Sequence, residues 1–119
     1  MLEICVVAGA LQWALAADRF TLAWNHSIEK VRWEEDYRRE GRMLVLDAAR
    51  VRGSAAGMEP PPGAVLRDGA WHYRPALPPL PRVVLANSSY GGSYELCTAE
   101  DCRKLPPASP TIIEPCPAR

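Results

Sequence analysis

An all-β fold, built as a single antiparallel sandwich or small barrel, is predicted by three features of this sequence. Apolar residues recur at every second position over short segments, which is typical of strands with one buried face. Glycine and proline clusters separate these segments, and 12 prolines in 119 residues require short elements joined by stiff loops. Hydrophobic residues make up 48% of the chain, which is enough for a core. We expect one β-rich domain over residues 1–105 and a proline-rich C-terminal tail, held only locally, over residues 106–119.

The chain opens with two predicted strands, at residues 2–7 and 11–15. Both segments are short and apolar, and a small Ala-Gly-Ala turn separates them. Glu3 stands where a signal peptide would carry a basic residue, and Gln12 interrupts the apolar run, which is also too short to span a bilayer. We therefore interpret these segments as folded structure, with no clear signal peptide and no membrane span.

Residues 20–37 predict the hairpin around which the rest of the fold is organised. Two alternating halves are separated by the polar pair Glu29 and Lys30, and each half has one apolar face. We expect that face to be buried and its indole rings to point inward. Its members are Phe20, Leu22, Trp24, His26, Ile28, Val31, Trp33, Glu35 and Tyr37.

A helix beginning at Ser27 is the competing interpretation of this segment. Its apolar stripe would contain only Ile28 and Val31, because Trp33 and Tyr37 would lie on a different side. Such a helix would bury too little apolar surface to be stable. The hairpin is therefore the interpretation that we adopt.

Turn residues delimit the later elements. Gly41 and the Asp68–Gly69 pair predict tight connections, and proline-rich segments at residues 53–63 and 75–81 predict loops or stiff connectors. The residues between them predict further strands at 43–50 (or 43–52), 65–66, 70–73, 83–86, 94–97 and 102–105.

Charge is balanced, with 14 basic and 14 acidic residues. This balance argues against a nucleic-acid surface and against a polybasic membrane anchor. Residues 32–39 alternate in sign, which predicts a solvated face of ion pairs. Glu35 is the exception, because it falls on the tryptophan-bearing face, where it needs a partner such as Lys30 or an arginine, or stays protonated.

Four cysteines predict disulfide chemistry. Cys97 and Cys102 are separated by four residues and would face each other across a hairpin, so we expect them to be bonded. Cys5 and Cys116 are the remaining pair, and their bond would join the first strand to the tail. The alternative is four reduced thiols, with Cys5 as a small core residue.

Motifs that could carry catalysis or metal are incomplete. Ser27 and Lys30 match the Ser-x-x-Lys pattern of penicillin-recognising enzymes, but the partner motifs of those enzymes are absent from the sequence. His26 and Ser27 are adjacent and would point to opposite faces of a strand, so they cannot form a nucleophile–base pair. His26 could act as a base beside Glu35, although a neutral packed histidine is the commoner case. The chain has no Cys-x-x-Cys pair and no histidine at ligand spacing. We expect no catalytic residue, no cofactor and no metal.

Three strings in the chain resemble a known family. They are HSIEKVRWEEDY from residue 26, GSAAGMEPPPG from residue 53 and the ending ELC….CRKL from residue 95. Over about residues 5–105 the sequence is similar to the bacterial family called domain of unknown function 1850. The characteristic positions of that family, whose roles are unassigned, correspond to His26, Ser27, Glu29, Lys30, Trp33, Glu34, Glu35, Gly53, Gly57, Met58 and Glu59.

This resemblance implies a periplasmic or otherwise exported protein, typically encoded beside tripartite ATP-independent periplasmic (TRAP) transporters of the TAXI type. Our first hypothesis is a non-enzymatic accessory or interaction module whose partners are TRAP transporter subunits. The alternative is a small-ligand or metal-binding protein that uses His26, Glu29 and Glu35. An enzyme built on Ser27 and Lys30 is the third hypothesis. The candidate binding or interaction residues are His26, Ser27, Glu29, Lys30, Trp33, Glu34, Glu35, Gly57, Met58 and Glu59.

Overall fold

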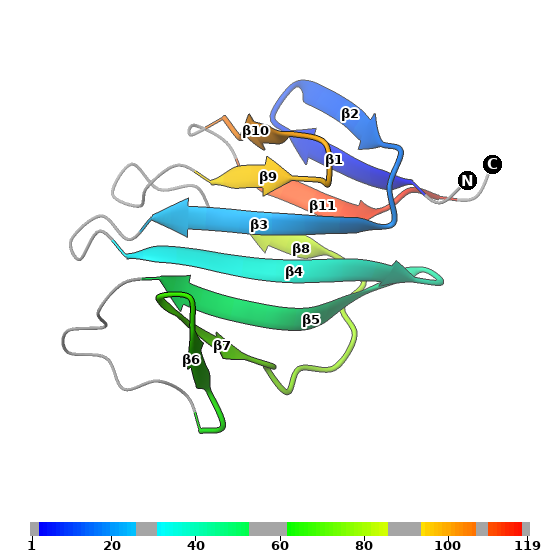
Figure 1. Cartoon of the computed structure of the whole chain (residues 1–119). Coiled ribbons are helices and arrows are strands. Elements are labelled where there is room, and N and C mark those ends of the chain that lie inside the picture. The colour runs from blue at the N-terminus through cyan, green and yellow to red at the C-terminus, as the bar shows by residue number, and fades with distance from the viewer. Residues whose placement is uncertain (1–2, 26–30, 53–61, 86–93, 107–109, 118–119) are drawn as a thin grey trace.

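Every regular element in the described part of the chain is a strand, which confirms the all-β prediction (Figure 1). The computed structural model describes residues 3–25, 31–52, 62–85, 94–106 and 110–117. The strands are β1 (Ile4–Ala8), β2 (Leu11–Leu15), β3 (Arg19–Asn25), β4 (Arg32–Glu40), β5 (Met43–Arg52), β6 (Val65–Arg67), β7 (Ala70–Tyr73), β8 (Val83–Leu85), β9 (Glu95–Cys97), β10 (Cys102–Lys104) and β11 (Thr111–Pro115).

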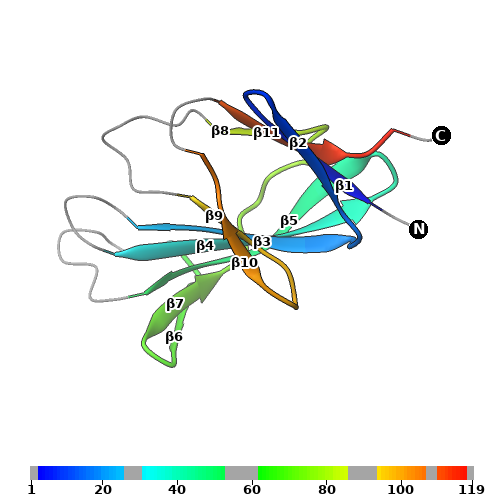
Figure 2. The same cartoon turned by 90° about the horizontal axis from the view of Figure 1, so that it is seen from above.

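The strands form two antiparallel sheets. One has four strands in the order β2-β1-β11-β8, and the other has seven in the order β10-β9-β3-β4-β5-β7-β6. Figure 2 shows the two sheets as separate layers that are inclined to each other. Neither sheet closes on itself, so the architecture is a sandwich and not the small barrel that the sequence left open.

The predicted hairpin is the centre of the seven-stranded sheet. β3 pairs with β4 along its whole length, with Trp24 opposite Trp33 and Phe20 opposite Tyr37. The rings of Phe20 and Tyr37 stack at 5.1 Å, and both residues are buried. The helix alternative is therefore wrong for its described part, since β4 is extended from Arg32 to Glu40.

A bulge in β5 keeps one face of this strand buried along its length. Tyr37 lies opposite Leu46, but Asp36 lies opposite Ala48, so Asp47 is an additional residue. Side chains alternate between faces, and the insertion reverses that alternation. As a result Leu44 and Leu46 before the bulge, and Ala49 and Val51 after it, are all buried.

The C-terminal tail is more than a local appendage, and that part of our expectation is wrong. β11 lies between β1 and β8 and pairs with both. Thr111 and Ile113 are both fully buried. The proline content concealed this strand, because Pro110 precedes it and Pro115 is its last residue. Proline is compatible with those positions at strand ends.

Side chains from both sheets form one core. Leu44 of β5 belongs to this core, and its backbone exchanges hydrogen bonds of 2.7 and 2.8 Å with the backbone of Leu80. These two bonds attach the proline-rich connector to β5. The buried cluster comprises Ile4, Val6, Phe20, Leu22, Tyr37, Leu44, Leu46, Val83, Leu85, Leu96, Leu105 and Ile113.

Both predicted disulfides are present. Cys97 bonds to Cys102 across the β9–β10 hairpin, and Cys5 bonds to Cys116 between the first and last strands. No cysteine is free. The first bond holds a local turn, whereas the second links residues 111 positions apart.

Candidate functional site

Only three of the candidate residues, Trp33, Glu34 and Glu35, lie in the described part of the chain, and all three are on β4. The described residues that precede the other candidates in the chain lie side by side in the sheet. Asn25, before residues 26–30, pairs with Arg32, and Arg32 also pairs with Arg52, before residues 53–61. The candidates outside the described residues are His26, Ser27, Glu29, Lys30, Gly57, Met58 and Glu59.

β4 separates the described candidates instead of bringing them together. Successive side chains of a strand point to opposite faces. Trp33 and Glu35 therefore share the face of Leu22, whereas Glu34 lies on the opposite face with Thr21 and Asp36. The structure thus divides them between an inner and an outer surface of the same sheet.

The inner surface carries a row of large apolar side chains, which we call the aromatic face. Residues directly opposite each other in an antiparallel pair share a face. The Trp24 and Trp33 rings stack at 6.2 Å between centroids with 6° between their planes, and Tyr94 lies 5.6 Å from Trp24. By register, the aromatic face runs across five strands as Trp24, Trp33, Val51, Trp71 and Leu66.

Sequence reasoning found only the first two members of this row. Trp71 was assigned to a strand, but its pairing with Val51 of β5 was not foreseen. The usable signal was the Asp68–Gly69 turn, which predicted the strand that contains Trp71. Local patterning indicates the strand but does not choose its neighbour.

Glu35 lies in the next row of the inner surface, between Leu22 and Ala49. The Tyr37 hydroxyl donates a hydrogen bond of 3.1 Å to its Oε1. Burial raises the pKa of the Glu35 carboxyl, and this hydrogen bond only partly opposes the increase. Burial, together with the nearby Glu35 charge, also raises the pKa values of Tyr37 and Tyr73. Among the described residues, the hydrogen-bond partner of Glu35 is therefore a phenol; Lys30, one of the partners that the sequence suggested, lies outside the described residues.

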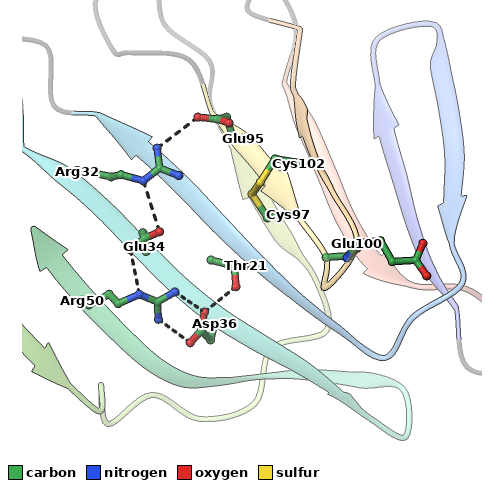
Figure 3. The surroundings of a disulfide bond; sticks show 10 residues. Thr21, Arg32, Glu34, Asp36, Arg50, Glu95, Cys97, Glu100 and Cys102 are labelled. Atoms are coloured by element: carbon green, nitrogen blue, oxygen red, sulfur yellow. Dashed lines mark hydrogen bonds and ion pairs between the residues drawn. A yellow bond between two sulfur atoms is a disulfide. The ribbon is translucent and has the colours of Figure 1, made fainter. Parts of the chain in front are cut away.

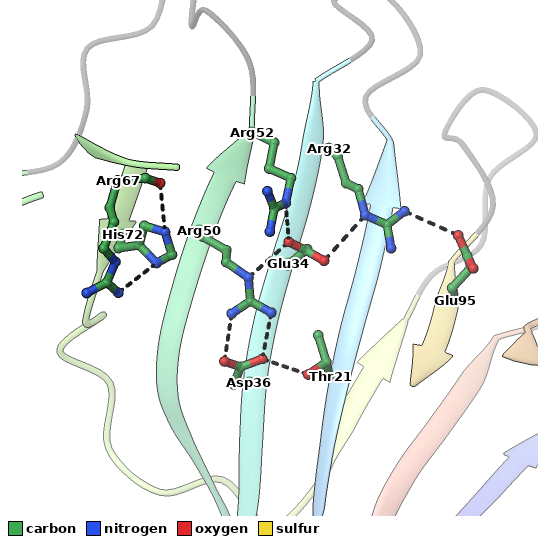
Figure 4. Close-up of polar contacts among 9 residues, drawn as sticks. All are labelled: Thr21, Arg32, Glu34, Asp36, Arg50, Arg52, Arg67, His72 and Glu95. Carbon is green, nitrogen blue, oxygen red and sulfur yellow. Dashed lines mark hydrogen bonds and ion pairs between the residues drawn. The ribbon is translucent and has the colours of Figure 1, made fainter. Parts of the chain in front are cut away.

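The outer surface, which we call the charged face, is organised around Glu34 (Figure 4). Arg50 and Arg52 each donate through Nε to Glu34 Oε1 at 2.9 Å. Arg32 bridges Glu34 at 3.4 Å and Glu95 at 3.3 Å. Burial opposes ionisation of Glu34, but the hydrogen bonds and charges of the two nearer arginines outweigh it and lower its pKa.

Asp36 continues the charged face. It accepts two hydrogen bonds from Arg50, of 2.7 and 3.2 Å, and one of 2.7 Å from the Thr21 hydroxyl. Burial again opposes ionisation, but Arg50 and Thr21 prevail and the pKa of Asp36 is lowered. The predicted ion-pair face is confirmed, and its carboxylates are held ionised by arginines.

A groove of about 320 Å³ is lined by residues of the charged face and by Cys97 of the Cys97–Cys102 disulfide. Figure 3 shows this disulfide near Thr21, Asp36 and Arg50. Cys97 pairs in register with Thr21, which brings the hairpin against the ion pairs. Glu95 lies near both sulfur atoms, a combination that can hold a metal when thiols are free. In this structure the two sulfur atoms are bonded to each other. The groove is lined by Arg19, Phe20, Thr21, Asp36, Tyr37, Asp47, Arg50, Cys97, Thr98 and Ala99.

Replacing Glu35 or Glu34 by glutamine should change the free energy of unfolding in opposite directions near neutral pH. The folded state holds the proton of Glu35 more tightly than the unfolded state does, so wild-type stability falls as pH rises through the raised pKa. Glu35→Gln removes that loss and should stabilise the protein at about pH 8, with a gain that shrinks toward acidic pH. Urea unfolding at several pH values measures this difference.

Glu34→Gln is the matched variant on the charged face. The lowered pKa of Glu34 contributes stability above its ordinary value of 4.5, which is lost as pH falls through the folded-state value. The variant should lose about 1–2 kcal/mol at neutral pH, because charged hydrogen bonds are removed, and should approach wild type in acid. The same direction of change in both variants would contradict the assignment of the two faces.

A family model described as Domain of unknown function (DUF1850) matches residues 20–105. That match contains nearly all of the seven-stranded sheet, and it leaves β1, β2 and β11 outside. The comparisons with curated proteins and with solved structures found no match. Among the described residues, no helix is long and apolar enough to cross a membrane. Both the aromatic face and the charged face lie within the matched residues.

Proposed function

The chain belongs to the family of the Domain of unknown function (DUF1850). From this premise we propose that it is a non-enzymatic interaction module. In this proposal the module acts outside the cytoplasm, together with a TAXI-type TRAP transporter. The transporter part of the proposal rests on the resemblance stated above. A binding role is supported by the charged face, where the carboxylates of Glu34 and Asp36 are held in ion pairs with arginines.

The observation that carries the proposal is the pairing of all four cysteines. Disulfides form and persist in oxidising compartments such as the bacterial periplasm, and they are rare in the cytosol. One of the two bonds closes nearly the whole chain, between Cys5 and Cys116. A small β-sandwich stabilised in this way fits an exported module.

Two edge strands offer positions at which a partner can bind. β6 and β8 each end a sheet, so one side of each strand has no neighbouring strand within the described sheets. Val65 on β6 is 60% exposed and Val84 on β8 is 59% exposed. Exposed edge strands with apolar side chains can accept a strand from another chain.

Site-specific photo-crosslinking in cells that produce the transporter tests this proposal. A benzophenone side chain at Val65 or at Val84 should crosslink to the binding protein or the permease of the transporter. The same group at Glu100, an exposed residue of the β9–β10 turn, is the control and should give no such product. If neither edge position yields a transporter subunit, the proposed association is wrong.

A second function, small-ligand binding, is favoured by a separate observation. Glu35 is a carboxyl with a raised pKa, and it lies beside the aromatic face without a basic neighbour among the described residues. Such a combination of apolar rings and one acidic group is typical of a small-molecule site.

A further inference from the structure

We propose that the aromatic face binds an organic cation bearing a methylated ammonium group, with Glu35 as its counter-ion. This inference deepens the second function proposed above and rests on it, but it does not require the transporter. Three features carry it: the arrangement of the indoles, the isolated charge of Glu35 and the position of the site beyond the four-stranded sheet.

The indoles supply the first feature. Trp33 and Trp71 both pair with Val51, one from each side, so the two rings lie on the same face of the sheet with one strand between them. Two strand spacings, roughly 10 Å, separate their backbones. At that separation both rings can lie within about 6 Å of one ammonium group, the range over which an aromatic face attracts a cation.

The charge of Glu35 supplies the second feature. Glu35 is two residues from Trp33 on β4, so the carboxyl and the indole project from the same face. Arginines are plentiful on β4 and β5, but strand alternation directs Arg50 and Arg52 to the charged face, where they bind Glu34. Among the described residues Glu35 therefore has only the Tyr37 hydroxyl as a hydrogen-bond partner. A half-buried carboxylate without a cation is unfavourable, and a bound ammonium group would supply the missing charge.

The position of the aromatic face supplies the third feature. The core cluster formed with the four-stranded sheet includes Phe20, Leu22 and Tyr37, but neither Trp33 nor Trp71. Figure 1 shows the four-stranded sheet behind β9, β3 and β4, while β7 and β6 extend beyond it. Trp33 and Trp71 accordingly keep part of their surface exposed. Among the described residues, the core between the two sheets does not include these two tryptophans, and part of each remains accessible to a ligand, whereas Val51 between them is buried.

Choline and dimethylbutanol, its uncharged carbon isostere, distinguish a cation site from a merely apolar one. Titration of the purified full chain with choline should give a saturable change in tryptophan fluorescence. Dimethylbutanol should bind about tenfold more weakly, because it lacks the charge that the rings and Glu35 attract. Equal binding of the two compounds, or no saturable response to choline, would overturn the proposal.

Paired variants assign the binding to these residues. Glu35→Gln and Trp33→Leu should each weaken choline binding about tenfold. Glu40→Gln, at the exposed end of β4, and Trp13→Leu, in β2 of the other sheet, are the matched controls and should bind choline as wild type does. Equal losses in Glu35→Gln and Glu40→Gln would refute the role of Glu35.

The outcome is independent of protein interactions and of variant stability. If Glu35→Gln does not fold, the comparison of choline with dimethylbutanol on the wild-type chain still decides the question. Because the titration uses purified protein, its failure would leave the crosslinking result intact, and a failed crosslink would not affect choline binding.

Discussion

Removal of the Cys5–Cys116 disulfide should lower the free energy of unfolding by about 5 kcal/mol. The bond joins residues 111 positions apart, so it restricts the unfolded chain strongly. It also lies where β1 pairs with β11, and the Cys116 amide donates a 3.0 Å hydrogen bond to the Glu3 carbonyl. Domains of this size are stable by only about 5–15 kcal/mol. Loss of this bond should therefore bring the protein close to unfolding.

Denaturant unfolding of the Cys5→Ala/Cys116→Ala double variant measures this effect. The Cys97→Ala/Cys102→Ala double variant is the matched control, since it also removes two sulfur atoms but opens a ring with a separation of only five residues. Its expected loss is about 2 kcal/mol. Similar losses in the two double variants would contradict an effect that depends on loop length.

Ile113→Ala should cost about 2–5 kcal/mol, the range for truncating a large buried aliphatic side chain. Ile113 is fully buried on β11, where it pairs with Val6 on one side and Val83 on the other. The substitution leaves a cavity between the two sheets, because Ile113 belongs to the buried cluster that side chains of both sheets form. Thermal and urea unfolding of the variant measure the loss.

Ile112→Ala is the control from the same strand. Ile112 points to the opposite face of β11 and pairs with Val84, whose side chain is exposed. Its truncation removes less buried surface and should cost about 1 kcal/mol. Equal losses at the two positions would mean that β11 does not pack as an inner strand of the sandwich.

Local patterning was sufficient for most individual strands. The alternation around Phe20, Leu22 and Tyr37 predicted a hairpin with one buried face, and these side chains are buried. The four-residue spacing between Cys97 and Cys102 predicted their disulfide for the same local reason. Both features depend on residues that are close in sequence, so the geometry of a few successive residues determines them.

Long-range pairing accounts for what was missed. The tail strand β11, which contains Ile113, lies between β1 and β8. These two neighbours are far from each other in the sequence, and β1 is also far from β11. The bulge at Asp47 becomes visible only when β5 is aligned with β4. The neighbourhood of Glu35 likewise depends on which strand lies beside β5, and Tyr73 comes from that strand.

The sequence by itself determined an all-β chain, its central hairpin, the Cys97–Cys102 pair and the alternation that separates Glu34 from Glu35. Tertiary structure alone decided the strand order in each sheet, the place of β11 and the row that joins Trp33 to Trp71. The physical reason is that alternation assigns a side chain to a face, whereas hydrogen bonding between distant segments selects the neighbours with which it shares that face.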